Sequence, residues 1–284
     1  MNIKDQLKIA TDILDEHNIE SGRLEAEILL AHTLNVGRLY LYINPEQTIS
    51  QEQVDDYNKL IERRTNHEPT AYILGHREFM DLDLIVNEDV LIPRPETEVL
   101  VESVIDHLND NTGIIKIADI GTGSGAIAIS LAKSLSGAAV EAVDISEKAI
   151  NVARLNIGKY NLLGRITVHL GDLLSPLNGK KFNAIVSNPP YIPSRVIDTL
   201  QAEVKDYEPS TALDGGMDGL DFYRRLFSES PKFLIDGGFL AVEIGFDQAE
   251  SVKKLAEAEG QFKDIEIIKD LSKNDRVIIA KYGD

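Results

Sequence analysis

The sequence contains no cysteine among its 284 residues. This absence excludes disulfides, thiolate metal sites and a cysteine nucleophile, and it is compatible with a reducing compartment. The chain also lacks a run of about 18 apolar residues, and its amphipathic, acidic N-terminus does not have the pattern of a signal peptide. We therefore expect a cytoplasmic protein without a membrane segment.

Basic residues are scarce, since 29 Lys and Arg face 47 Asp and Glu, which gives a formal net charge of -18. Residues 1–75 hold 7 of the basic and 13 of the acidic residues, so the acidity extends over the whole chain. A protein that follows a phosphate backbone needs clustered Lys and Arg. We therefore expect no direct, tight binding to nucleic acid.

The sequence also lacks a metal-binding pattern. Its six histidines show no metal-ligand spacing and are interpreted as structural or surface residues: His17, His32, His67, His76, His107 and His169. The segment 214–219 is superficially similar to a calcium loop but lacks the downstream glutamate that would bind the ion. We predict no metal site.

Residues 1–68 have apolar positions at helical spacing and are predicted to form a small helical bundle, which binds a partner or acts as a lid. Ser21 is expected to cap the second helix, and Ser50 with Gln53 forms a capping-box pattern before another. Residues 69–89 are predicted to be a hinge hairpin, with short strands at 71–75, 78–80 and 82–86.

From residue 90 onward the pattern predicts an α/β domain that extends to residue 284. A helix is expected to begin near Pro95 and continue to Leu108. Strands then alternate with helices, which is typical of a doubly wound sheet with helices on both faces. The last two strands have no helix between them, so we expect one of them to be an antiparallel edge strand. The predicted strands are 115–120, 139–145, 166–170, 182–187, 238–244, 265–269 and 276–281.

A glycine-rich segment, Asp119-Ile120-Gly121-Thr122-Gly123-Ser124-Gly125-Ala126, lies where the first of these strands turns into a helix. Glycines there let the backbone approach a ligand closely, and a helix N-terminus favours negative charge. The spacing also satisfies the fingerprint of dinucleotide-binding proteins. Taken alone, the segment indicates a ligand site and leaves the ligand open.

Two acidic residues follow the next two strands, at the edge where doubly wound sheets bind ligands. Asp144 can accept hydrogen bonds from both hydroxyls of a ribose. Asp172 can accept from an adenine amino group, with Leu173 covering the ring. Either aspartate can instead cap a helix, although Ser146 competes for that position after Asp144.

The fourth strand ends in Asn188-Pro189-Pro190-Tyr191. Pro190 has no N–H and restricts the residue before it, so the loop is stiff. The Asn188 side chain and the proline carbonyls form an array of acceptors for an NH2 group, beside which the Tyr191 ring can lie on a planar group. The alternative is an ordinary proline turn that leaves a strand.

These features together favour one class of enzyme, because a dehydrogenase has no evident use for a loop that grips an amide. They are similar to the class I methyltransferases that use S-adenosylmethionine to methylate the nitrogen of a planar amide or amine. The predicted cofactor-binding residues are Asp119, Gly121, Thr122, Gly123, Gly125, Asp144, Asp172, Leu173 and Asn188. The predicted sheet is then the seven-stranded sheet of that class, preceded by the small helical domain.

Nearly the whole chain resembles the bacterial peptide chain release factor N5-glutamine methyltransferases (the HemK/PrmC family). The resemblance rests on these segments: Leu91-Ile92-Pro93-Arg94-Pro95-Glu96-Thr97-Glu98, Asn188-Pro189-Pro190-Tyr191-Ile192-Pro193, Tyr207-Glu208-Pro209 and Ala212-Leu213-Asp214-Gly215-Gly216. One position departs from the expected pattern, since Lys273 stands where a small residue such as glycine is expected.

The resemblance implies that the substrate is the glutamine in the Gly-Gly-Gln loop of class I release factors. Asn188, Pro189 and Tyr191 are then the catalytic residues, and Pro190 joins them in binding the substrate. Asn188 Oδ1 and the Pro189 carbonyl would accept the two amide hydrogens, and Tyr191 would pack on the amide. No general base is evident, and we expect a monomer.

Three other functions remain open at this point. An adenine-N6 nucleic-acid methyltransferase uses a similar loop to grip a flipped base. A ribosomal-protein glutamine methyltransferase differs only in its substrate. A silent module would bind S-adenosylmethionine and dock on a translation factor without turnover. Arg94 and Glu96 either face the cofactor or substrate or only begin a helix.

Overall fold

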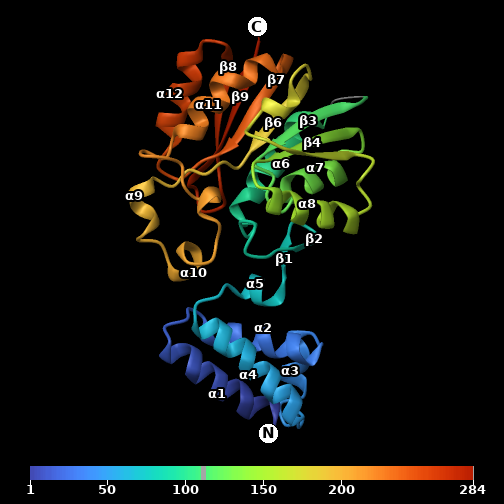
Figure 1. Cartoon of the computed structure of the whole chain (residues 1–284), viewed down its shortest axis with the longest axis vertical. Coiled ribbons are helices and arrows are strands. Elements are labelled where there is room, and N and C mark those ends of the chain that lie inside the picture. Colours follow the sequence, from blue (N-terminus) through green and yellow to red (C-terminus); the bar gives the residue numbers. More distant parts are fainter. Residues whose placement is uncertain (110–112, 284) are drawn as a thin grey trace. The chain divides into compact units, whose positions relative to one another are not determined.

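The computed structural model describes residues 1–109 and 113–283, and these form two compact units (Figure 1). Unit 1 contains Met1–His76 and Gln201–Tyr207. Unit 2 contains Arg77–Leu200 and the chain from Glu208 onward. These bounds differ from the predicted 1–68, 69–89 and 90–284, because the predicted linker is divided between the units and a later segment belongs to unit 1.

Unit 1 is helical, as its periodicity predicts. Its helices are α1 (Ile3–Glu16), α2 (Gly22–Leu34), α3 (Arg38–Ile43), α4 (Gln51–Thr65), α5 (Thr70–Leu74) and the short α10 (Ala202–Lys205). The capping box before α4 is present, since the Gln53 N–H donates to Ser50 Oγ and the Ser50 N–H donates to Gln53 Oε1. Ser21 precedes α2, but its side chain makes no capping hydrogen bond.

The core of unit 1 joins α1, α2 and α4 around Tyr57, which is fully buried and donates its hydroxyl to the Ala26 carbonyl. The segment from α10 is attached by polar contacts. Arg64 Nη2 contacts Glu203 Oε2 at 2.8 Å, and the Tyr207 hydroxyl donates to the Asn66 carbonyl at 2.7 Å.

The predicted strand at 71–75 is wrong. These residues form α5, a single helical turn that buries the adjacent side chains Tyr72 and Ile73 and ends at Gly75, whose φ of 78° is left-handed. The other two predicted strands form a two-stranded sheet of β1 (His76–Phe79) and β2 (Leu82–Ile85). Phe79 and Leu84 belong to the core of unit 2, so this sheet packs there.

Unit 2 is built on a seven-stranded sheet with the order β5-β4-β3-β6-β7-β9-β8. The strands are β3 (Ile115–Ile120), β4 (Ala138–Asp144), β5 (Ile166–Leu170), β6 (Phe182–Ser187), β7 (Leu234–Glu243), β8 (Phe262–Lys269) and β9 (Asp275–Tyr282). The first five pair in parallel, whereas β9 runs antiparallel to both β7 and β8. The predicted antiparallel edge strand is β8, which forms the edge and pairs antiparallel with β9, while β9 lies inside the sheet.

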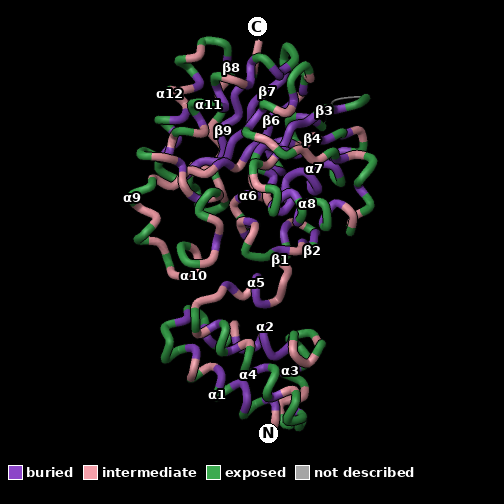
Figure 2. The backbone as a smooth tube through the Cα atoms, viewed as in Figure 1, coloured by how far each residue is buried: buried purple, intermediate pink, exposed green. Residues whose placement is uncertain are grey.

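Helices cover both faces of this sheet (Figure 1). One core contains α6 (Glu96–Leu108), α7 (Ala126–Ser134) and α8 (Glu147–Lys159), and the other contains α11 (Asp221–Glu229) and α12 (Ala249–Glu259). Successive strand residues alternate between the cores, since Ile117 faces the first and Ala118 the second. The central strands β3 and β6 are therefore buried almost throughout (Figure 2).

The loop between β8 and β9 explains the departure at Lys273. Its φ is 67°, a left-handed conformation that favours glycine, so the expected small residue matches the backbone that the loop adopts. Within residues 1–109 and 113–283, no helix has the length and apolar character needed to cross a membrane.

Candidate active site

A cavity of about 600 Å³ opens in unit 2 at the carboxyl ends of β3, β4, β5 and β6. This is the position at which doubly wound sheets bind ligands, and the volume suits a small molecule. Eight residues from the predicted site line it: Gly121, Gly123, Asp144, Asp172, Leu173, Asn188, Pro189 and Pro190. Eight of the twelve predicted site residues therefore line this cavity, and other residues form the rest of its wall.

The loop Gly121–Gly125, here called the glycine loop, turns sharply from β3 into α7. Gly121, Gly123 and Gly125 have φ values of 75°, 54° and 84°, which glycine adopts without steric cost. The Gly121 and Thr122 N–H groups both donate to the Val143 carbonyl at 2.9 Å. A Cβ atom at Gly123 would meet no atom within 4 Å, so the backbone there borders open space.

Asp119 is placed beneath the glycine loop instead of in the cavity. It is fully buried, and its Oδ2 accepts from the Thr122 hydroxyl at 2.6 Å and the Ala128 N–H at 3.1 Å. Burial raises the pKa of Asp119 to about 7, although these hydrogen bonds lower it. Among the described residues, Asp119, Thr122 and Gly125 do not line the cavity, so their predicted cofactor contact is corrected to support of the loop.

Asp144 ends β4 and joins two loops. Its Oδ2 accepts from the Gly123 N–H and its Oδ1 from the Ser146 N–H, both at 2.9 Å. Ser146 is the cap of α8, as the sequence suggested, because its Oγ accepts from the Ala149 N–H. Burial raises the pKa of the Asp144 carboxyl. The Ile145 N–H also donates to this carboxylate, which retains acceptor capacity for a hydroxyl donor.

Asp172 follows β5 and forms a two-bond ion pair with Arg225 of α11. The guanidinium contacts Oδ1 at 3.0 Å and Oδ2 at 2.9 Å. Leu173 lies beside it with a φ of 47° and is almost fully buried. Arg225 lies 53 positions away in the sequence, so no local pattern predicts this pair.

Asn188, Pro189 and Pro190 follow β6 and bring acceptors to the cavity wall; together with Tyr191 we call them the acceptor loop. The Asn188 side-chain Nδ2 donates to Thr97 Oγ1 at 3.0 Å. The Thr97 hydroxyl in turn donates to Glu243 Oε2 at 2.6 Å. The Asn188 side chain also donates to Glu243, so its Nδ2 is engaged by both α6 and β7. Among the described residues no donor is bonded to its Oδ1, which can act as an acceptor.

Tyr191 lies apart from the rest of the acceptor loop. Tyr191 is not one of the described residues that line the cavity. Its side chain packs against the core formed by α11 and α12. Burial raises the pKa of its hydroxyl, and the nearby charge of Glu243 raises it further. Its ring packs beside the loop and remains partly exposed, and its contact with a substrate stays a prediction.

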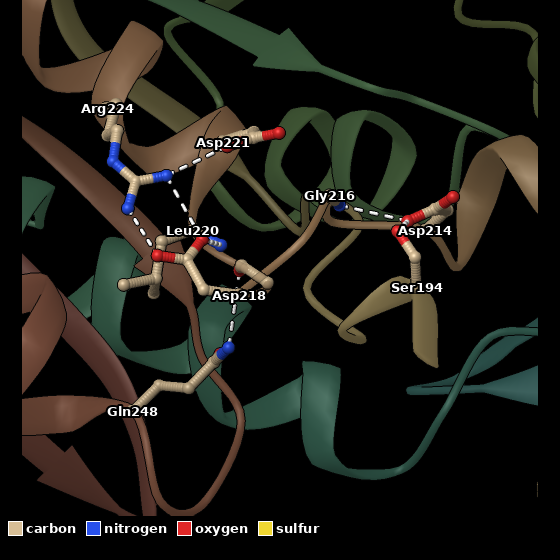
Figure 3. A network of polar contacts seen from close by, with 9 residues as sticks. Ser194, Asp214, Gly216, Asp218, Leu220, Asp221, Arg224 and Gln248 are labelled. Atoms are coloured by element: carbon tan, nitrogen blue, oxygen red, sulfur yellow. Dashed lines mark hydrogen bonds and ion pairs between the residues drawn. The ribbon is translucent and has the colours of Figure 1, made fainter. Parts of the chain in front are cut away.

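A second loop, Asp214 to Asp221, packs directly on the acceptor loop. Figure 3 shows the polar contacts of this second loop. A Cβ at Gly215 would lie 2.8 Å from Tyr191 Cα and 2.9 Å from the Pro190 carbonyl, so only glycine allows this approach. Asp214 shapes the loop by accepting from the Ser194 hydroxyl at 2.7 Å and the Gly216 N–H at 2.9 Å.

Gln248 joins the two loops. Its Nε2 donates to the Tyr191 carbonyl at 3.0 Å and to the Gly219 carbonyl at 3.2 Å, while its Oε1 accepts from the Gly245 N–H. Because the side chain is nearly buried, these bonds have little competition from water. A single amide therefore keeps both loops in register.

The segment before α6 forms another part of the wall through Asp89, Val90 and Leu91. Glu208 holds this segment, since it pairs with Arg94 and accepts from the Ile92 N–H. Among the described residues, neither Arg94 nor Glu96 lines the cavity. The structure thus favours the structural interpretation of Arg94.

The charge of the wall is mostly negative. Five aspartates line the cavity (Asp89, Asp144, Asp172, Asp214 and Asp221), and among the described residues Arg225 is the one basic side chain in its lining. Three of these carboxylates are partly compensated, Asp89 by Lys148, Asp172 by Arg225 and Asp221 by Arg224. The cavity therefore favours a ligand with positive charge.

Sequence reasoning did not assign Thr97, Glu243, Gln248 or Arg225 to the site. Thr97 lies within a segment that carries the family resemblance, which was the one available signal. Glu243 ends β7, a position where site residues are common in this architecture. Gln248 and Arg225 had no distinguishing pattern.

The sheet, the glycine loop and Asp144 define a class I methyltransferase that uses S-adenosylmethionine. A solved methyltransferase from Pyrococcus furiosus has the same fold, with a TM-score of 0.52, 21% identity, and coverage of 72% of this chain and 91% of that one. Two family models match, the PrmC N-terminal domain at residues 5–75 and the methyltransferase small domain at 96–204.

Full-length relatives identify the particular family. The release factor glutamine methyltransferase of Clostridium acetobutylicum is 45% identical over 100% of this chain and 99% of its own. That of Moorella thermoacetica is 44% identical over 99% and 98%. The chain belongs to the release factor glutamine methyltransferase family.

Proposed function

We propose that this protein transfers a methyl group from S-adenosylmethionine to the side-chain nitrogen of the glutamine in the Gly-Gly-Gln loop of class I release factors. The observation that carries the proposal is the acceptor loop, whose residues Asn188, Pro189 and Pro190 line a cavity beside the glycine loop. Its membership of the release factor glutamine methyltransferase family supports the same substrate.

The residues present fit S-adenosylmethionine. The glycine loop borders open space, Asp144 retains acceptor positions for ribose hydroxyls, and the acidic wall suits a sulfonium and an ammonium group. Asp172 and Leu173 would hold the adenine. When bound, S-adenosylmethionine supplies a methyl group that its positive sulfur makes electrophilic.

The acceptor loop then acts on the glutamine. We propose that Asn188 Oδ1 and the Pro189 carbonyl accept the two amide hydrogens and orient the nitrogen. An amide nitrogen is a poor nucleophile because its lone pair is delocalised, and these acceptors stabilise the positive charge that develops on it. No general base is required, because the alkylated amide loses its proton readily. The rest of the rate enhancement comes from the orientation of the two reactants in a site with little water.

We further propose that unit 1 binds the release factor. Leu39, Tyr42 and Ile43 of α3 are exposed to 70%, 56% and 68%, which is unusual for apolar side chains grouped on one short helix. We also propose that the protein is a cytoplasmic monomer and that it does not bind nucleic acid tightly. The net charge of -18 supports the last of these statements. Retention on heparin at physiological salt would contradict the last part.

The test is methylation of a purified class I release factor with labelled S-adenosylmethionine. We expect label on the intact factor, none when its loop glutamine is alanine, and at least about 10²-fold less with Asn188→Ala of this protein. Cofactor binding without label would support a silent module. Label on a ribosomal protein or on adenine instead of the release factor would replace the proposed substrate.

A further inference from the structure

The side-chain amide of Asn188 is held in a chain of hydrogen bonds with a fixed direction. Asn188 Nδ2 donates to Thr97 Oγ1 at 3.0 Å, and the single Thr97 hydroxyl proton is donated to Glu243 Oε2 at 2.6 Å. An ionised carboxylate only accepts, so Thr97 has no proton left for a second bond. If the amide turned over, Asn188 Oδ1 would face the Thr97 oxygen without a proton between them.

The chain is shielded from water. Thr97 is 4% exposed and Glu243 is 1% exposed, and they come from different elements, α6 and β7. In such surroundings an unmatched donor or acceptor costs more than it does at the surface. The orientation of the Asn188 amide is therefore determined by two residues that do not line the cavity.

We propose, on the basis of the function proposed above, that Thr97 and Glu243 are positioning residues that keep Asn188 Oδ1 turned toward the substrate amide. The chemistry requires this orientation. The substrate nitrogen presents two N–H groups, which an oxygen can accept and an NH2 group cannot. With the amide reversed, Asn188 would present donors to donors.

Several charged and titratable groups surround Glu243. Arg276 of β9 attracts its charge, Glu96 of α6 repels it, and the Tyr191 and Tyr223 hydroxyls are kept neutral by burial. Burial raises the pKa of Glu243 to about 7, although the hydrogen bond from Thr97 and the charge of Arg276 lower it. Its ionisation therefore changes within the range in which enzymes are assayed.

Protonation of Glu243 would reverse the chain. A protonated carboxyl can donate to the Thr97 oxygen, which frees the Thr97 proton for a bond to Asn188 Oδ1. The Asn188 NH2 group would then face the substrate. Turnover should consequently fall as the pH decreases through the pKa of Glu243, while cofactor binding stays nearly constant.

The experiment compares Thr97→Val, Thr97→Ser and Glu243→Gln with the wild-type enzyme, at saturating S-adenosylmethionine and release factor. Valine keeps the shape of threonine and removes the hydroxyl, so we expect kcat to fall about tenfold or more with cofactor Kd changed less than about threefold. Serine restores the hydroxyl and most of the activity. The acid limb of kcat should be absent in Thr97→Val and Glu243→Gln.

Ser103→Ala is the matched control, because Ser103 is also buried on α6 but bonds only to the Val99 carbonyl of its own helix. It should keep wild-type kcat and the acid limb. If the wild-type enzyme is active and Thr97→Val is equally active, the positioning role is overturned. It is also overturned if Thr97→Val loses cofactor binding together with kcat. An inactive wild type would instead contradict the proposed function.

Discussion

The two loops that line the cavity after the neighbouring strands β3 and β6 are built on opposite principles. The glycine loop presents flexible backbone at positive φ, whereas the acceptor loop is stiffened by two prolines that have no N–H to donate. Both nevertheless rest on a buried acid with a raised pKa. Asp119 and Glu243 each accept from a threonine hydroxyl at 2.6 Å.

The difference lies in where the threonine comes from. Thr122 is three positions from Asp119, so the support of the glycine loop is local. Thr97 is 146 positions from Glu243, so the support of the acceptor loop needs the folded sheet. The bond between Asp119 and Thr122 lies within one segment, although the N–H groups of the glycine loop also bond to Val143 and Asp144 of β4. The bond between Thr97 and Glu243 forms only when α6 and β7 have assembled.

The largest expected effect comes from Asn188→Asp, which tests whether the acceptor loop acts in methyl transfer and not in cofactor binding. Asn188→Asp keeps an acceptor toward the cavity but places a second carboxylate oxygen against Thr97 and the buried Glu243. We expect kcat to fall by about 10²–10³-fold, because the second carboxylate oxygen disturbs the position of the acceptor that stabilises the developing charge. Cofactor affinity should change little. Steady-state methylation and calorimetric cofactor binding measure the two quantities separately.

The counterpart on the other side of the cavity is Asp144→Ala. Loss of the Asp144 carboxylate removes charged hydrogen bonds to the cofactor. The cofactor Kd should therefore rise about 10- to 100-fold, while kcat at saturation stays within a fewfold of the wild-type value. Identical effects of the two substitutions on kcat and Kd would show that the loops do not divide the work in this way.

A smaller effect concerns the two buried acids. The unfolded chain ionises Asp119 above about pH 4, whereas the folded state keeps its proton up to about pH 7, so this residue's contribution to stability decreases as the pH rises between those values. Asp119→Asn should remove that decrease. Relative to wild type, its free energy of unfolding should rise by about 1–4 kcal/mol from pH 5 to pH 8, as measured by urea titration.

The same variant distinguishes Asp119 from Glu243. Asp119 has no path to Asn188, so Asp119→Asn should retain the acid limb of kcat that Glu243→Gln loses. An acid limb that disappears in both variants would mean that the pH dependence reports the stability of unit 2 and not the orientation of Asn188.

The smallest expected effect tests the use of glycine at positive φ. Lys273→Gly relieves a left-handed lysine, so we expect the free energy of unfolding to rise by about 0.5 kcal/mol. Lys254→Gly provides the control, because it lies in the exposed interior of α12 and should lower stability by about 0.7 kcal/mol. Thermal melting of the two variants should therefore shift in opposite directions.

Particular elements show what sequence reasoning can and cannot supply. The strands β3, β5 and β6 follow from runs that end near glycine or proline, and β4 from a run that ends at Asp144. Their alternation with helices places Gly121, Asp144 and Asn188 at one edge of the sheet. The segment 71–75 was assigned incorrectly because a five-residue apolar run does not distinguish a helical turn from a strand. Its two adjacent buried residues, Tyr72 and Ile73, are compatible with either before the surrounding packing is known.

The site shows the same limit. Gly123 and Asp144 were found because each lies at a strand end beside turn residues, whereas the pairing of Asp172 with Arg225 and of Thr97 with Glu243 depends on residues brought together from distant parts of the chain. Tyr191 illustrates the same limit, since its position beside Asn188 did not predict that its side chain packs against the core of α11 and α12. Side-chain direction at the end of a loop is set by tertiary packing, which a single sequence does not encode locally.

The inner position of β9 has a consequence for how unit 2 opens. In the described sheet β8 pairs with β9 alone, and β9 pairs with β7, so the amides of β8 belong to a hairpin that is attached through one strand. Separation of β9 from β7 would release both strands together. Hydrogen exchange should therefore show β8 and β9 as one cooperative segment. The amides of β8 should exchange at least as fast as those of β9.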